Sequence, residues 1–147
     1  MTIVQYSIDS ASTQRRLYTV RAQVHLSPDL DRVEFASIIQ GCDNLLHLDF
    51  PSTPSREDVD SFQNQIRNFE NRREAFIRTI TASNHKLRKE YKDLPLESRR
   101  EGKIEHYLDG NIRSLKELIR KGRELEAFSD VRVTELKGKI TPSEHNT

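Results

Sequence analysis

Residues 59 to 94 read VDSFQNQIRNFENRREAFIRTITASNHKLRKEYKDL, and their apolar positions recur at alternating intervals of three and four. Eight of the eleven positions in this register are apolar, and neither proline nor glycine interrupts the run. The positions are Val59, Phe62, Ile66, Phe69, Arg73, Phe76, Ile80, Ser83, Leu87, Glu90 and Leu94. This heptad spacing predicts one long helix whose narrow apolar seam packs against another helix.

The length of this helix predicts an elongated molecule. A helix of about 36 residues is about 54 Å long, at 1.5 Å per residue. A compact globule of this chain length has a radius of gyration of only about 15 Å, so it cannot enclose such a helix. Ser55 lies three residues before Asp58 and predicts a capping box at the start of the helix. Pro95 marks the place where the helix should end.

A second amphipathic stretch follows Pro95 and predicts the other arm of an antiparallel helical hairpin over residues 55–128, with its bend near residue 95. Ser98 and Glu101 suggest a capping box at its start. The apolar phase passes through Gly110 unchanged, which favours a continuous or kinked helix over a break there. The seam of this arm is Ile104, Leu108, Asn111, Leu115, Leu118, Gly122 and Leu125, widened by Tyr107, Ile112, Ile119 and Phe128.

A charged pair is the expected register device of the hairpin. If the bend is centred near Pro95, Arg73 of the first arm approaches Glu117 of the second. An unpaired charge in a helix seam is costly, whereas a paired one can fix the register. We therefore hypothesise an ion pair between Arg73 and Glu117. The alternative is that the Arg73 side chain extends into water.

The first 50 residues have a different pattern, which predicts a small head with strands. Apolar and polar residues alternate over residues 4–8 and 18–26, as in a β-hairpin. Residues 46–50 alternate again and suggest a third strand, although a helix that runs to about His47 is the competing interpretation. The predicted fold class is therefore α+β and predominantly helical, with a β-β-α(-β) head followed by a long coiled-coil-like hairpin.

Three local signals complete the predicted organisation. Ser27 followed by Pro28 suggests the start of the helix in the head. Residues 51–54 contain two prolines and predict a linker between the head and the hairpin. Residues 129–147 are expected to hold a short strand at 131–134, where Val-Arg-Val-Thr is β-prone, and a flexible tail. A helix that continues through Leu136 is the alternative.

Composition narrows the class of protein. The chain has 24 Lys and Arg against 23 Asp and Glu, and its net charge of +1 argues against a general nucleic-acid coat protein. The single cysteine, Cys42, excludes an internal disulfide and a zinc site built from several thiolates. We expect it to be a buried apolar residue. The first residues lack the pattern of a secretory signal, and no apolar run approaches 18 residues, so we expect a cytoplasmic protein outside the membrane.

The residue patterns of common active sites are missing from the sequence. There is no Gly-x-Ser-x-Gly motif and no glycine-rich phosphate-binding loop. Cys42 has no neighbouring base in the sequence that would activate it. Neither His85 nor His106 has a glutamate three residues before it, as a two-metal carboxylate bundle requires. We therefore expect neither an enzyme nor a site for a metal or another cofactor.

The wide apolar stripe of the second arm predicts a protein that works by association. Ile112 and Ile119 lie beside the seam, so another helix or the head must cover them. We expect a non-enzymatic scaffold or adaptor that assembles through its hairpin, most simply as a homo-oligomer. A small regulatory subunit that docks on a larger complex is an alternative.

The predicted tip of the hairpin is basic and offers a further alternative. Residues 86–103 carry seven basic and four acidic side chains. Clustered basic residues neutralise the phosphates of nucleic acid, and they also complement an acidic protein surface. The candidate residues for such contacts are Arg88, Lys89, Lys92, Arg99, Arg100 and Lys103.

Overall fold

The computed structural model describes residues 26–140, and within this range the protein is 82% helical with no strand. The described helices are α2 (Arg32–Leu46), α3 (Arg56–Asp93), α4 (Leu96–Glu101) and α5 (Ile104–Lys139). The predicted α+β fold class is therefore wrong, and the described part of the chain is helical. The strands predicted at 4–8 and 18–26 lie outside the described residues, apart from Leu26, which is not in a strand.

The long helix α3 confirms the heptad prediction. The Ser55 hydroxyl accepts a hydrogen bond from the Asp58 backbone N–H, and the Asp58 carboxylate accepts one from the Ser55 N–H. This reciprocal capping box satisfies two backbone donors at the start of the helix. The seam residues from Val59 to Ser83 are buried except Arg73, whereas Leu87 is only partly buried. The seam is thus covered over most of the helix but not at its far end.

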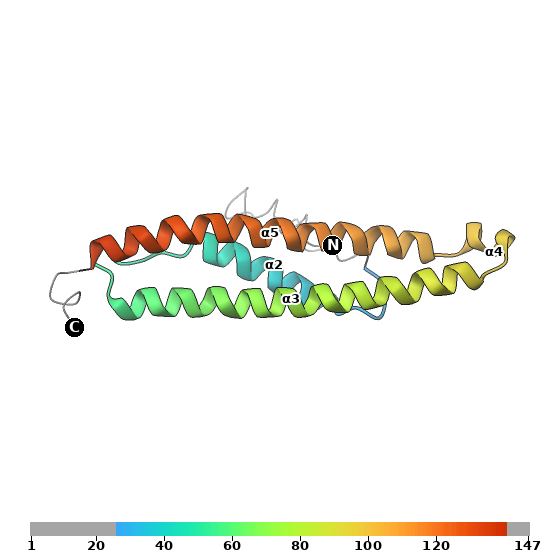
Figure 1. The fold of residues 1–147 in the computed structure, drawn as a ribbon, viewed down its shortest axis with the longest axis horizontal. Helices are drawn as coiled ribbons and strands as arrows, with labels where there is room; N and C mark the ends of the chain where they lie inside the picture. The colour runs from blue at the N-terminus through green and yellow to red at the C-terminus, as the bar shows by residue number, and fades with distance from the viewer. Residues whose placement is uncertain (1–25, 141–147) are drawn as a thin grey trace, which may run out of the picture.

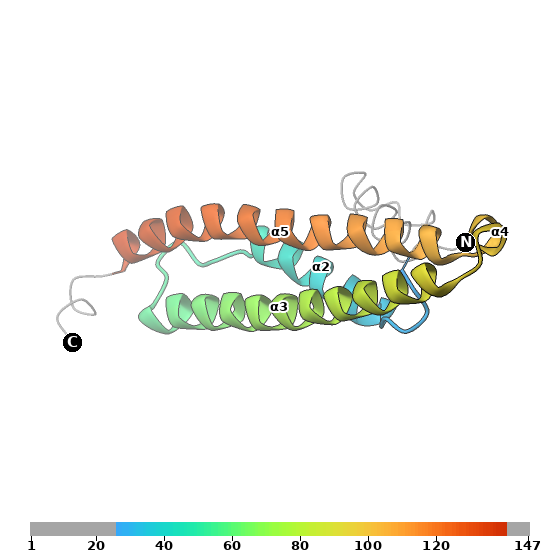
Figure 2. The same cartoon turned by 45° about the vertical axis from the view of Figure 1, so that its right-hand side comes forward.

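Helices α3 and α5 run antiparallel along nearly their whole length, and α2 packs against both (Figure 1). The view turned by 45° shows the same elongated arrangement, with α4 at the tip of the hairpin (Figure 2). One apolar cluster joins the three long helices. It includes Phe35, Ile38 and Cys42 from α2, Phe62, Phe76 and Ile80 from α3, and Leu118, Leu125 and Leu136 from α5. The predicted helix of the head therefore shares its core with the hairpin.

The helix α2 begins and ends differently from the sequence prediction. Its N-cap is Asp31, which accepts a hydrogen bond from the Glu34 N–H, so the helix does not start at Ser27 and Pro28. The Ser27 hydroxyl, which would have to cap the helix, instead accepts a hydrogen bond from Asn111 of α5 and lies 3.1 Å from the Ser83 hydroxyl of α3. At the other end, α2 stops at Leu46 with His47 as its C-cap. The alternative of a helix to His47 is confirmed, and the predicted third strand at 46–50 is wrong.

Helix α5 is continuous through Gly110 and reaches Lys139. The expectation of a helix that continues through Gly110 is confirmed, although the arm predicted to start near Pro95 is interrupted between α4 and α5. The strand predicted at residues 131–134 is wrong, and the alternative of a helix through Leu136 is confirmed. Those residues stay helical because Leu136 is 1% exposed and Val133 packs against the core, which holds this last part of α5 in the bundle. Burial of a helical face outweighs the β-propensity of two valines.

The bend at the tip is longer than the sequence suggested. Pro95 ends α3, but α4 is a separate helix over Leu96–Glu101, and α5 starts only at Ile104. The second arm therefore does not begin with the capping box predicted at Ser98. The additional helix shifts the register of the hairpin, because it occupies chain that a tight bend at Pro95 would have placed in the second arm.

Candidate interaction surfaces and buried polar contacts

Ile112 and Ile119 lie on the side of α5 that faces away from α2. Lys121 marks the side towards α2, since its Nζ and its backbone carbonyl both contact residues of that helix. At 100° per residue, Ile112 is about 180° and Ile119 about 160° around the helix from Lys121. Both isoleucines are partly buried. Helix α2 therefore cannot be the element that covers them.

We define the open face as the side of the α3–α5 hairpin opposite α2. On α5 it contains Ile112, Leu115 and Ile119, all partly buried. On α3 it contains Ile77, also partly buried, and Arg73. Because Leu115 and Ile77 pack against the edge of the core, the open face continues the apolar interior of the bundle towards its surface.

Arg73 and Gly122 meet where α3 and α5 cross at this face. A Cβ atom added to Gly122 would lie 2.6 Å from Cζ and 2.7 Å from Nε of Arg73. The guanidinium group therefore rests directly on the glycine. The Arg73 Nε is buried and has no hydrogen-bond partner among the described residues. A cation thus occupies a seam position without an acceptor at its Nε.

The structure does not bring Arg73 and Glu117 together. Glu117 instead pairs with Arg120, one turn further along its own helix. Arg73 meets Gly122, which lies five residues beyond Glu117 along α5. Arg73 thus lies opposite a residue further along α5 than predicted. This direction is expected, because α4 adds residues to the tip between the two arms.

The basic side chains of the tip divide into two groups. Arg88, Lys89, Lys92 and Lys103 are exposed, as the sequence suggested. Arg99 instead donates hydrogen bonds to the backbone carbonyls of Lys92 and Leu94, at 2.8 and 3.1 Å. Its guanidinium also lies 5.2 Å from the ring centre of Tyr91. Arg99 therefore binds the last backbone carbonyls of α3 and is not free for a partner. The backbone of Arg100 lies in α4, and its side chain is not described.

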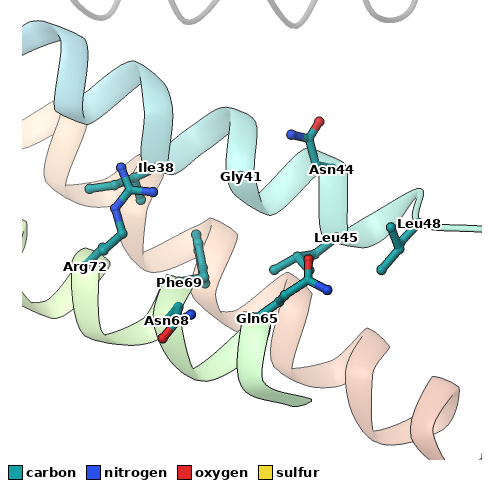
Figure 3. A pocket seen from close by; sticks show the side chains of 9 residues that line it. All are labelled: Ile38, Gly41, Asn44, Leu45, Leu48, Gln65, Asn68, Phe69 and Arg72. Atoms are coloured by element: carbon teal, nitrogen blue, oxygen red, sulfur yellow. The ribbon is translucent and has the colours of Figure 1, made fainter. Parts of the chain in front are cut away.

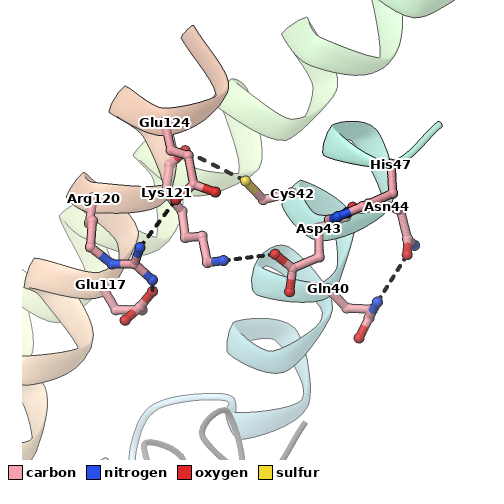
Figure 4. Close-up of polar contacts among 9 residues, drawn as sticks. All are labelled: Gln40, Cys42, Asp43, Asn44, His47, Glu117, Arg120, Lys121 and Glu124. Atoms are coloured by element: carbon pink, nitrogen blue, oxygen red, sulfur yellow. Dashed lines mark hydrogen bonds and ion pairs between the residues drawn. The ribbon is translucent and has the colours of Figure 1, made fainter. Parts of the chain in front are cut away.

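A buried ion pair fastens α2 to α5 (Figure 4). The Lys121 Nζ lies 2.7 Å from Asp43 Oδ1, and the two side chains are 7% and 5% exposed. Cys42 is buried beside them, and its Sγ lies 3.5 Å from the carbonyl oxygen of Lys121. Burial raises the pKa of the Cys42 thiol to about 12, although the Lys121 ammonium lowers it in part. The thiol is therefore protonated at neutral pH and is not a nucleophile.

A second buried polar cluster connects the segment before α2 to both arms of the hairpin. Asn111 is 0% exposed, and its Oδ1 accepts a hydrogen bond from the Ser27 N–H at 3.0 Å. Its Nδ2 donates to Ser27 Oγ at 3.0 Å and to Asn84 Oδ1 at 2.9 Å. One carboxamide thus binds α5 to α3 and to the segment that leads into α2. The heptad spacing predicts Asn111 as a seam residue, but nothing in the sequence indicates this role.

The cluster ends at an exposed carboxylate, that of Asp29. The Ser83 hydroxyl donates to Asp29 Oδ1 at 3.0 Å and lies 3.1 Å from the Ser27 hydroxyl. Burial raises the pKa of Asp29, but the hydrogen bonds from Ser27 and Ser83 and the charge of Lys86 lower it, so the net shift is downward. Asp29 is therefore charged at neutral pH. The same residues border an open hollow of about 430 Å³, which extends to Lys103 and Tyr107.

A groove of about 220 Å³ runs between α2 and α3 (Figure 3). Its apolar lining includes Ile38, Leu45 and Phe69, and its polar lining includes Asn44, Gln65 and Asn68. A Cβ added to Gly41 would meet nothing within 4 Å, so this glycine is not required for close packing of the two helices. Arg72 closes one end, where Glu34 and Ser37 accept its hydrogen bonds. The groove is therefore apolar, with an uncharged polar border of Asn44, Gln65 and Asn68 and the Arg72–Glu34 ion pair at one end.

Within residues 26–140, no group of three or more His, Cys, Asp or Glu residues is placed to hold a metal ion. None of the helices in the same range has an apolar stretch long enough to span a bilayer. The chain matches no family model, no curated protein and no solved structure. Candidate functions therefore rest on the surfaces and contacts described above.

Proposed function

We propose that this protein is a non-enzymatic assembly protein that associates through the open face of its helical hairpin. The observation that carries the proposal is the position of Ile112 and Ile119, which lie on the side of α5 away from α2. Apolar side chains on the outer side of a bundle are typical of a protein–protein contact. A second copy of the chain is the simplest partner for such a face.

The size of the open face is compatible with a stable complex. Helix α5 is about 54 Å long, and two packed helices are together about 20 Å wide. The hairpin therefore presents roughly 1,000 Å² on this side, estimated from these two dimensions. Standard interfaces bury about 800 Å² on each partner. A face-to-face contact between two hairpins meets this requirement without any contribution from α2.

Light scattering of the full chain tests the proposal. We expect a mass above that of the 17.2 kDa monomer at micromolar concentration. Replacing both isoleucines with aspartate, in the double variant Ile112→Asp and Ile119→Asp, should return the mass to that of the monomer. The reason is that two carboxylates would be buried in the contact without partners.

The matched control is the double variant Val33→Asp and Val131→Asp, which introduces the same two charges at exposed β-branched residues of α2 and α5. Val131 is 61% exposed and lies on another side of the helix from Ile112 and Ile119. This variant should keep the mass of the unmodified chain. A strictly monomeric wild-type chain at micromolar concentration would count against the proposal.

Nucleic-acid binding at the tip is a second candidate function, supported by the exposure of Arg88, Lys89, Lys92 and Lys103. If it operates, replacing the first three with alanine should weaken binding of a fluorescent RNA or DNA duplex at low salt and reduce the salt dependence of the affinity. The control removes equal charge elsewhere on the molecule, at Lys116, Lys137 and Lys139. No anisotropy change at low salt with the wild-type chain would exclude this function.

A further inference from the structure

We propose that the open face is a self-complementary dimer interface in which Arg73 of each protomer pairs with a glutamate, Glu70 or Glu126, of a second copy. The inference rests on the proposed function, association through the hairpin, and adds the partner and the central contact. Arg73 is the observation that motivates it. The guanidinium lies at the edge of the open face, and its buried Nε has no acceptor within the described part of the chain.

Arg73 is unfavourable for the single chain. It occupies a heptad position whose neighbours in the seam, Phe69 and Phe76, are 5% exposed. Burial of part of a guanidinium without an acceptor loses hydration that nothing in the described residues replaces. An apolar residue at this position would complete the seam. A side chain that lowers the stability of the fold in this way is expected at a functional contact.

Gly122 leaves the space that the Arg73 guanidinium occupies. A Cβ at residue 122 would lie 2.6 Å from Cζ, 2.7 Å from Nε and 2.8 Å from Nη1 of Arg73, so any other residue would push the guanidinium away. Glycine in the middle of a helix is itself unfavourable. Two unfavourable residues therefore meet at one crossing point of α3 and α5. The combination holds a cation against the helix surface, where a carboxylate from outside can reach it.

The acceptors that this contact requires are present on the same face. Glu70 precedes Arg73 by three residues, about 60° around α3, and Glu126 follows Gly122 by four residues, about 40° around α5. Both glutamates are exposed. Neither belongs to an ion pair within residues 26–140.

Among its charged side chains the open face thus carries a cation with an unsatisfied donor and at least two unpaired anions, each within about one helical turn of the crossing. A two-fold axis presents the same surface of each protomer to the other, so residues of opposite charge meet twice. The second copy therefore offers both the apolar cover for Ile112 and Ile119 and the carboxylate for Arg73. Charge complementarity identifies it as the occupant of this face.

Sedimentation equilibrium of the full chain measures the predicted dimer. Arg73→Leu should weaken dimerisation at least tenfold, yet the isolated protomer should unfold at a higher temperature than wild type, measured well below the dissociation constant. Gly122→Ala should also weaken the dimer, because its methyl group displaces the guanidinium. The matched control is Arg113→Leu, which removes the same charge from an exposed position of α5, about 180° around the helix from Gly122. It should leave the dissociation constant unchanged.

A charge exchange tests the pairing directly. Arg73→Glu, and separately the double variant Glu70→Arg and Glu126→Arg, should each fail to self-associate at concentrations where wild type is dimeric. A mixture of the two should form a heterodimer, because each Arg73→Glu carboxylate then meets an arginine. Recovery of the heterodimer would support the contact.

The outcomes separate this inference from the proposed function. A dimer that depends on Ile112 and Ile119 but not on Arg73 or Gly122 would overturn the contact and leave association through the hairpin in place. A monomeric wild-type chain would overturn both. A lower unfolding temperature for the Arg73→Leu protomer would show that Arg73 supports the single chain, which also overturns the inference.

Discussion

Replacing Lys121 with methionine is expected to lower the free energy of unfolding by about 3–5 kcal/mol, the usual effect of breaking a buried ion pair. Methionine retains most of the volume of the lysine stem, so the loss comes from the charge rather than from a cavity. Asp43 loses the ammonium group 2.7 Å from its carboxylate while its side chain remains 5% exposed. Urea unfolding followed by circular dichroism measures the effect.

The chain provides a matched control at almost the same distance. Arg72 and Glu34 also join α2 to the hairpin, at 2.8 Å, but their side chains are 44% and 37% exposed. Arg72→Met should therefore change the free energy of unfolding by no more than about 1 kcal/mol. The Arg72 variant loses more hydrogen bonds than the Lys121 variant, since Arg72 donates to both Glu34 and Ser37. A smaller loss of stability at Arg72 would therefore reflect its exposure to solvent. Equal losses in the two variants would contradict the explanation.

The double variant Lys121→Met and Asp43→Leu distinguishes the interaction between the two charges from the contribution of each residue alone. Removal of both charges leaves no buried ion behind, and an apolar pair of similar volume is often as stable as the original. We expect the double variant to lie within about 1 kcal/mol of wild type, well above either single variant. Simple addition of the two single losses would show that the two residues act independently.

The same ion pair explains why the packing of α2 was not predictable from the sequence. The apolar pattern of α3 identified its buried side correctly, because six of its eight buried residues are apolar. On α5 the side towards α2 includes buried polar residues, among them Ser114 and Lys121. A pattern of apolar residues cannot reveal a contact formed by polar ones. The sequence therefore suggested a separate head instead of a third helix in the same core.

The candidate surfaces were predictable to different degrees. Ile112 and Ile119 followed from the width of the apolar stripe, since that width does not depend on the register of the hairpin. The partner of Arg73 did depend on the register, and the register depends on α4, whose six residues carry only a weak pattern. Gly122 appeared in the sequence as a small seam residue. Its contact with Arg73 could not be assigned until the two arms were aligned.

Replacing Asn111 with alanine is the second change with a large expected effect, a loss of about 3–4 kcal/mol in the free energy of unfolding. The carboxamide is 0% exposed and makes hydrogen bonds to Ser27 and Asn84. Alanine would leave the buried Ser27 N–H and the Asn84 carbonyl oxygen without this partner, and each such group costs about 1–3 kcal/mol. The smaller side chain also leaves a cavity between the helices.

Ser114 supplies the control for Asn111, because it lies about one turn along α5 and is also 0% exposed. The Ser114 hydroxyl has no hydrogen-bond partner among the described residues. Ser114→Ala removes a buried polar atom that is already unsatisfied, so it should leave the free energy of unfolding unchanged or raise it by up to about 1 kcal/mol. If Ser114→Ala lost as much stability as Asn111→Ala, the loss at Asn111 could not be assigned to its hydrogen bonds. A large loss confined to Asn111 would identify its carboxamide as the group that aligns α3, α5 and the segment before α2.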